Sequence, residues 1–323
     1  GFTDEEGARM LDRLATLVEQ VALAGERRWP DATSAPERFD ATLAALRLDH
    51  ADGTAGQILP ALAEIFGLRP VDLDLLTAAS SVEFDPNFGM AYGLLPGRPG
   101  PSRVTMALAF ELCGAPLMSA PARARLGPLA PLRRDLLLDL LGEEPMPRRT
   151  LRVADRVVAH LLGDDTWDPA VAAMRLGTNT FDSHAFDSHG ASGFDALPAD
   201  QALSSRAATL AAAIERGEPL NWVHARAGTA GISLAVQAFR SLSISCVTID
   251  LRRCPAEISL DGAVRLATRE AALRRCGLVV AGAGLLADTA TSWILRLLLE
   301  AAVPVVAVSD VGWTRSSMSA FTQ

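Results

Sequence analysis

A glycine-rich turn in the C-terminal half of the chain has residue types that bind phosphate. It follows an apolar run at residues 220–224, which predicts a β-strand, and it precedes a helical pattern that extends to Phe239. A glycine turn between a strand and a helix presents backbone amides and the helix N-terminus to an anion. Gly228, Gly231 and Ser233 are therefore the candidate cofactor-binding residues, arranged as in a P-loop.

The same turn lacks the lysine that steadies the terminal phosphates of a bound nucleotide. Against the pattern G-x-x-x-x-G-K-[ST], Arg226 replaces the first glycine, Gly231 matches the second and Ile232 takes the lysine position. A register that begins at Gly228 lacks the lysine as well. All 30 basic residues of the chain are arginines, but drift from lysine to arginine does not explain an isoleucine here. We expect a vestigial P-loop that binds nucleotide weakly at most.

A second requirement for ATP hydrolysis, a pair of acids at the end of a neighbouring strand, is also missing. Residues 277–280 predict that strand, and acids there would organise Mg²⁺ and the attacking water. The chain continues with Ala281 and Gly282 instead, and Asp288 fits a helix cap better than a displaced catalytic acid. We therefore expect no catalytic residues, and we assign neither ATP nor Mg²⁺ firmly as a cofactor.

Two other interpretations of the turn stay open. A dinucleotide site of the Rossmann type needs G-x-G-x-x-G, which is absent, and Asp250 alone at the end of the next strand is a common feature. The interpretation that we favour is a parallel-sheet scaffold without a ligand, in which Gly282 and Gly284 mark a turn.

The elements around the turn alternate regularly between strand and helix. Such alternation predicts βαβ units and a parallel sheet, which we assign to an α/β domain at residues 201–323. The expected strands are residues 220–224, 246–251, 276–281 and 304–308, and the expected helices are residues 204–215, the segment ending at Phe239, 260–274 and 291–302.

The N-terminal half predicts short helices with proline-marked starts. The first helix begins at a capping box of Thr3 and Glu6 and is expected to end near Gly25. Pro70 and Pro86 fit first-turn positions of later helices. We assign a helical segment to residues 1–55, and a winged-helix-like domain to residues 56–165 with helices at 58–66, 71–82, 87–95, 103–113, 132–141 and 155–162 and an extended piece at 150–153.

Residues 166–200 are expected to form a linker. A near repeat within it contains Asp182, His184, Asp187 and His189, which are residue types that ligate zinc. No other ligands lie nearby in the sequence, so we interpret the repeat as part of a solvated linker and assign no metal site. The four cysteines show no metal spacing and are expected to be reduced.

Composition limits the classes of partner. The formal net charge of −8 argues against general coating of nucleic acid, whose affinity comes from neutralised phosphates. No uncharged run approaches the roughly 20 apolar residues that cross a membrane, and the N-terminus lacks the pattern of a secretory signal, so we expect a cytoplasmic protein with no membrane partner. A local DNA-binding face remains an alternative, carried by Arg133, Arg134, Arg148, Arg149 and Arg152.

Three segments, residues 66–76, 83–93 and 151–163, carry a resemblance to a known family. They resemble the winged-helix region of bacterial AAA+ ATPases that often accompany gene clusters for extracellular contractile injection systems. The resemblance covers residues 56–165 and continues more weakly into the α/β domain, where such proteins carry a degenerate ATPase module ahead of an active one.

The resemblance implies a multidomain fold, a winged-helix region followed by an AAA-type, P-loop-like α/β domain that is incomplete at residue 323. It implies a non-catalytic region that binds protein partners, including injection-system components, and that belongs to a homo-oligomer in the full-length protein. ATP hydrolysis is then expected in a module outside this chain. The alternatives are a winged-helix DNA-binding regulator and an active ATP hydrolase that uses unorthodox residues.

Overall fold

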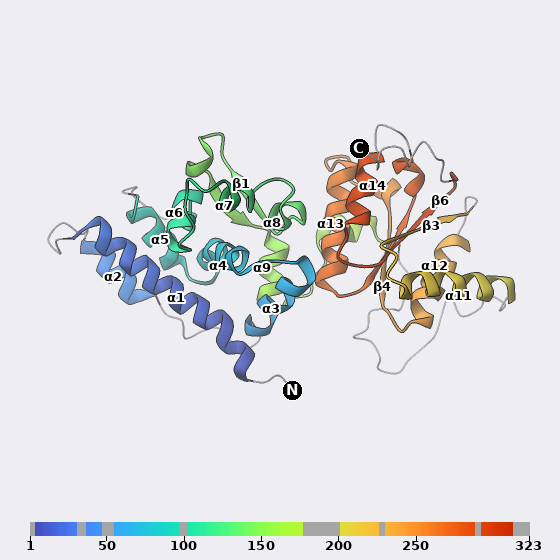
Figure 1. Ribbon diagram of the computed structural model, residues 1–323, viewed down its shortest axis with the longest axis horizontal. Coiled ribbons are helices and arrows are strands. Elements are labelled where there is room, and N and C mark those ends of the chain that lie inside the picture. Colours follow the sequence, from blue (N-terminus) through green and yellow to red (C-terminus); the bar gives the residue numbers. More distant parts are fainter. Residues whose placement is uncertain are drawn as a thin grey trace. The chain divides into compact units, whose positions relative to one another are not determined.

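The computed structural model describes residues 4–30, 37–46, 55–96, 102–176, 201–225, 230–287 and 292–312. The chain divides into two compact units, Gly1–Thr166 and Trp167–Gln323 (Figure 1). Among the described residues, no helix combines the length and the apolar character that would let it span a membrane.

The first unit begins with a group of helices packed around α1. The inward face of α1 carries Leu14, Leu17 and Val21, which are all buried and which repeat at helical spacing. Helix α1 contacts α3 and α4. These elements are α1 (Asp4–Arg28), α2 (Glu37–Ala45), α3 (Ala55–Phe66), α4 (Pro70–Phe84) and α5 (Pro86–Leu94).

We expected the first helix to end near Gly25, but α1 continues to Arg28. A side chain at Gly25 would collide with the ring of Phe39 in α2. The glycine therefore permits a close approach of two helices. Its role is in packing, and a sequence pattern cannot distinguish that role from a helix stop.

The helix starts marked by proline agree with the prediction. Pro70 and Pro86 occupy the first turns of α4 and α5. Asp85 caps α5, because its Oδ1 accepts a hydrogen bond from the amide of Asn87 at 2.8 Å. Each start thus satisfies amides that the helix itself leaves unpaired.

The second half of this unit is a set of short helices followed by an antiparallel β-hairpin. Strand β1 pairs with β2 in a register that places Leu138 opposite Val153, and Thr105 adds an isolated bridge to Thr150. The arrangement matches the winged-helix expectation. The elements are α6 (Met106–Leu112), α7 (Ala120–Ala124), α8 (Pro131–Arg134), β1 (Leu138–Leu141), η1 (Met146–Arg148), β2 (Thr150–Val153) and α9 (Asp155–Leu161).

The helix expected at residues 132–141 is wrong. Helix α8 ends at Arg134, Leu136 adopts a left-handed backbone with φ of 52°, and β1 begins at Leu138. The leucine-rich run is compatible with helical spacing and with strand alternation alike. Pairing with β2 decides between them, because it buries Leu138 and Leu140 while Asp139 faces solvent.

The second unit is built on a four-stranded parallel sheet of order β3-β6-β5-β4. This confirms the parallel sheet that the sequence predicts, with strand boundaries that agree within a residue. The elements are α10 (Pro169–Met174), α11 (Gln201–Glu215), β3 (Leu220–His224), α12 (Ala230–Ser241), β4 (Cys246–Asp250), η2 (Leu251–Arg253), α13 (Leu260–Leu273), β5 (Gly277–Ala281), η3 (Ala283–Leu286), α14 (Ser292–Leu299) and β6 (Val305–Ser309).

The chain crosses from β3 to the opposite edge at β4 and then returns through β5 to β6. Right-handed crossovers in opposite directions place their helices on opposite faces of a sheet. Figure 1 shows this arrangement, with α11 and α12 on one side and α13 and α14 on the other. The α12 face is closed by a core of Ala235, Phe239, Val279 and Val306.

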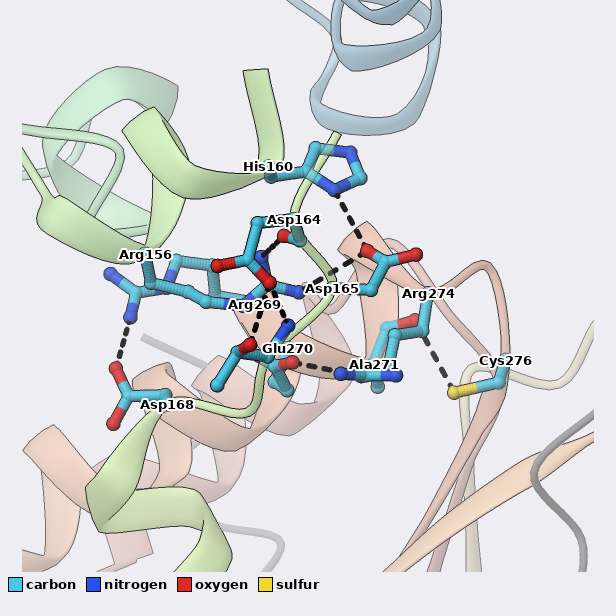
Figure 2. Close-up of polar contacts among 11 residues, drawn as sticks. Arg156, His160, Asp164, Asp165, Asp168, Arg269, Glu270, Ala271, Arg274 and Cys276 are labelled. Atoms are coloured by element: carbon cyan, nitrogen blue, oxygen red, sulfur yellow. Dashed lines mark hydrogen bonds and ion pairs between the residues drawn. The ribbon is translucent and has the colours of Figure 1, made fainter. Parts of the chain in front are cut away.

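Helix α10 lies within the range that we expected to be a linker. Val171 and Met174 are fully buried, and α10 contacts α13. Asp168 caps the helix and also pairs with Arg269 of α13 at 2.6 Å (Figure 2). Residues 177–200, which include the Asp and His repeat, lie outside the described residues.

Trp167 provides a second attachment of this segment to the sheet unit. The guanidinium carbons of Arg175 and Arg274 lie 3.7 Å and 3.6 Å from the centre of its ring. Arg274 is itself held by Glu270, with Nε to Oε1 at 2.8 Å (Figure 2). Cation–π contacts on one ring, together with the Asp168 ion pair, fix the start of the unit onto α13.

Candidate functional site

The candidate site lies at the carboxyl ends of β3 and β6. These ends are adjacent, because His224 pairs with Ser309 and the amide of Ala225 donates to the carbonyl of Ser309 at 2.8 Å. The helix that follows β3 lies on the sheet face opposite to the helices that lead into β5 and β6. In open α/β sheets, ligands bind outside the carboxyl ends of strands where the connections change face.

The structure brings two of the three predicted residues together. Gly231 and Ser233 both lie in the first turn of α12. Gly228 and Arg226 lie outside the described residues, so their part in the turn stays a prediction.

Gly231 has a packing role that does not depend on a ligand. A Cβ atom at this position would lie 2.7 Å from Cβ of Ala225 and 2.7 Å from Cγ1 of Val308. The glycine lets the first turn of α12 approach both β3 and β6. The glycine that matched the phosphate-binding pattern is therefore explained by close contact between helix and sheet.

Ser233 carries an unusual polar atom. Its Oγ is buried and has no hydrogen-bond partner among the described residues. A buried hydroxyl without a partner costs roughly 1–3 kcal/mol, so such atoms are rare in proteins. Among the described residues of the turn, this hydroxyl is a feature that would still suit an anion.

Ile232 occupies the lysine position and faces the wrong way for phosphate chemistry. Its half-buried side chain packs against the apolar cluster that contains Ala235 and Phe239. The side chain at this position therefore packs at the margin of the hydrophobic core. A lysine there would have to leave that contact to reach a nucleotide.

The end of β5 is occupied by an arginine and its partner. Arg252 donates from Nε to Oδ1 of Asp250 at 2.9 Å and from Nη2 to Oδ2 at 3.2 Å. A Cβ at Gly282 would lie 2.9 Å from Oδ1 of Asp250 and 3.3 Å from Nε of Arg252. The sequence pattern indicates Asp250 but gives no signal for Arg252, whose contact with Asp250 depends on the turn that η2 makes after β4.

The Arg252 pair keeps Asp250 ionised. Burial opposes ionisation of this carboxyl, but the hydrogen bonds and charge of Arg252 outweigh burial and lower its pKa. Both oxygens of Asp250 are engaged, and β5 ends in Ala281 without an acid. The described residues at this edge therefore do not fit a Mg²⁺-nucleotide centre. Across the described chain, no group of three or more metal-ligating side chains is present.

The arginines of the hairpin region do not form a free basic face. The wing between β1 and β2 carries Glu143 and Glu144 as well as Arg148 and Arg149, so its charges balance. Arg149 donates to the carbonyl of Glu144 at 2.8 Å. Three further arginines pair with aspartates: Arg133 with Asp139 at 3.3 Å, Arg134 with Asp135 at 2.8 Å, and Arg152 with Asp155 at 3.0 Å.

The fold and site together define a winged-helix protein with a parallel α/β unit. A family model described as "Winged helix domain, variant" matches residues 7–174. The match spans more than half of the chain, and the chain belongs to this family. No curated protein and no solved structure matches the chain.

The family match also bears on how the chain is divided. It begins within α1 and includes helices that we assigned to a separate segment at residues 1–55. It ends with α10, which folds with the sheet unit. The AAA+ and injection-system parts of the resemblance have no counterpart in these comparisons and remain predictions.

Proposed function

We propose that this chain is a non-catalytic region of an AAA+ type ATPase, in which the winged-helix domain binds a protein partner and the α/β unit serves assembly. ATP hydrolysis belongs to a module outside this chain. The observation that carries the proposal is the pair of replacements at the sheet edge. Ile232 packs at the margin of the hydrophobic core where a lysine would bind phosphate, and Arg252 covers the strand end where acids would hold Mg²⁺.

The surface of the winged-helix domain supports a protein partner over DNA. In helix-turn-helix proteins, base edges are read by a helix before the wing. Here the residues between α6 and β1 form only the short helices α7 and α8, which have five and four residues. Met118 and Leu129 flank α7 and are 90% and 79% exposed. These two side chains offer apolar surface to a protein partner, whereas DNA binding draws on basic groups that are available to phosphates.

The test is steady-state phosphate release by the purified chain with ATP and Mg²⁺. The proposal predicts no release above buffer, and it predicts weak or no binding of a fluorescent ATP analogue. Ser233→Ala is the matched control, because it changes only the hydroxyl of the vestigial turn. Release that is proportional to protein and lost in Ser233→Ala would instead support the active hydrolase with unorthodox residues.

A further inference from the structure

One edge of the α/β unit is covered by the residues that begin this unit, residues 167–176, which we call the strap. The strap contains α10 and follows directly on residue 166, the last residue of the first unit. The covalent connection from the winged-helix domain therefore enters the α/β unit through the strap. Helix α10 contacts β4, η2 and α13, which follow one another in the sequence. The strap thus joins the incoming chain to one continuous part of the sheet unit.

The strap is held by a charge pair near its start and by backbone pairing at its end. Nη2 of Arg269 on α13 donates to Oδ2 of Asp168 at 2.6 Å, and these side chains are only 3% and 14% exposed (Figure 2). At the other end, the amide of Leu176 donates to the carbonyl of Thr248 at 3.0 Å, and Arg175 forms an antiparallel bridge with β4. Because β4 is an edge strand, the strap covers part of an open sheet edge.

The end of the strap also contacts η2, the short turn that carries Arg252. Nη1 of Arg253 donates to the carbonyl of Arg175 at 3.1 Å. Within η2, the carboxylate of Asp250 caps the turn, because its Oδ1 accepts from the amide of Arg252 at 3.0 Å as well as from Nε of the same residue. Neighbouring arginines of one turn therefore extend in two directions, Arg253 to the strap and Arg252 to the carboxyl end of β5.

The strap and η2 both depend on packing for their shape. Helix α10 has six residues and η2 has three, whereas isolated helices shorter than about 12 residues are marginal in water. The strap buries Val171 and Met174, and η2 buries Leu251. Since the two segments contact each other, loss of one removes support from the other. Short segments that are held in this way open as one cooperative unit.

We propose that the strap is a latch that holds η2, and with it Arg252, at the carboxyl end of β5, so that the strap and Arg252 are released together. The inference rests on the proposed function, in which Arg252 covers this end of the sheet. Displacement of the strap through the incoming chain would withdraw Arg252 and free the carboxylate of Asp250 at the sheet edge. The latch gives a partner of the winged-helix domain a means of changing the candidate site.

The experiment measures amide hydrogen exchange of the full chain by mass spectrometry, in peptides that cover the strap and residues 250–254. Asp168→Asn removes the charge opposite Arg269 but keeps a side-chain oxygen that can cap α10. The strap peptide is expected to exchange roughly tenfold faster, and the peptide of residues 250–254 should accelerate by a similar factor. The substituted residue pairs with α13, whereas the second peptide contains η2, so a joint increase measures their coupling.

Arg253→Ala tests the latch from the other end and keeps the proposal testable if Asp168→Asn fails to fold. It removes an exposed side chain that donates to the strap. Because coupling is reciprocal, the strap peptide should exchange faster in this variant as well as the peptide that contains η2.

Two controls separate the latch from a general loss of stability. Arg296→Ala removes an arginine from an exposed pair on α14 and should exchange like the wild type. Gly231→Ala perturbs the unit from α12 and should not accelerate the two peptides selectively. Acceleration of only one peptide in Asp168→Asn or Arg253→Ala, no acceleration of either, or the same selective pattern in Gly231→Ala would overturn the proposal. The measurement contains no nucleotide, so its failure leaves the phosphate-release result unaffected and the two are judged separately.

Discussion

Arg125 donates from Nε to Oδ1 of Asp72 at 2.8 Å and joins the end of α7 to the first turn of α4. Asp72 is fully buried, and its Oδ2 also accepts from the amide of Arg69 at 2.8 Å. The hydrogen bond to Asp72 raises the pKa of Arg125. One carboxylate thus caps a helix and holds the segment before the wing against the helical core.

Arg125→Ala should destabilise the winged-helix domain strongly. It leaves the Asp72 carboxylate buried without its cation, and removal of one partner of a buried pair costs roughly 3–5 kcal/mol. Urea denaturation followed by circular dichroism measures the loss. Arg152→Ala is the matched control, because its pair with Asp155 is exposed and should contribute little. Similar small effects from both substitutions would contradict this role of Asp72.

Gly231→Ala should destabilise the α/β unit. The added methyl group would lie 2.7 Å from atoms of Ala225 and Val308, and overpacking of this kind typically costs about 1–3 kcal/mol. The companion change Ser233→Ala removes a buried hydroxyl with no partner among the described residues, so stability should stay equal or rise slightly. The midpoint of thermal unfolding measures both. A neutral Gly231→Ala would remove the packing explanation of this glycine.

Cys246 and Cys276 should react slowly with thiol reagents in the native chain. Burial raises the pKa of Cys246 to about 11 and that of Cys276 to about 12. Since the thiolate is the nucleophile, at pH 8 these groups carry far less reactive form than an ordinary cysteine. Cys254, on the loop after η2, should label first. Mass spectrometry after timed alkylation identifies the order, and early labelling of Cys276 would contradict the burial of this residue.

The same shifts give a dependence of stability on pH. The folded chain favours the neutral thiols, so their contribution is complete below the usual thiol pKa of 9.0 and declines as the pH rises above it. Replacement of both Cys246 and Cys276 by alanine should flatten this alkaline decline. Urea midpoints between pH 7 and pH 10 measure the difference, and parallel curves for both chains would refute the assignment.

Duplex DNA should bind weakly or not at all. Arg133, Arg134 and Arg152 already pair with aspartates, so little free charge remains to release counterions from phosphate. Fluorescence anisotropy with a labelled duplex at two salt concentrations measures this. Tight binding that falls steeply with salt, and that Arg148→Ala weakens, would favour the DNA-binding regulator instead.

The sequence predicts the parallel sheet well because strands buried on both faces appear as apolar runs. Residues 277–281 and 305–309 are such runs, because every residue of both strands is buried. Strand β1 is missed because its leucines fit either period until β2 pairs with them. Helix α10 is missed because its burial comes from α13, more than eighty residues away in sequence.

In the candidate site, too, the features that are local in the sequence could be predicted and those that depend on tertiary contacts could not. The positions of Gly231 and Ser233 on a strand-turn-helix are local properties, so the pattern around them locates the turn. The placement of Arg252 over Gly282 is a tertiary contact between two strand ends, and no spacing in the sequence specifies it. The absence of acids at the end of β5 could be predicted, but the position of Arg252 beside Gly282 could not.

The central claim, that this chain does not hydrolyse ATP, is tested most directly under single-turnover conditions. Excess chain is mixed with a trace of ATP labelled on the terminal phosphate, with Mg²⁺ present, and released phosphate is followed for hours. The account predicts the uncatalysed rate for the wild type and for Ser233→Ala alike. Release that is faster with wild type, proportional to chain concentration and lost in Ser233→Ala would contradict it.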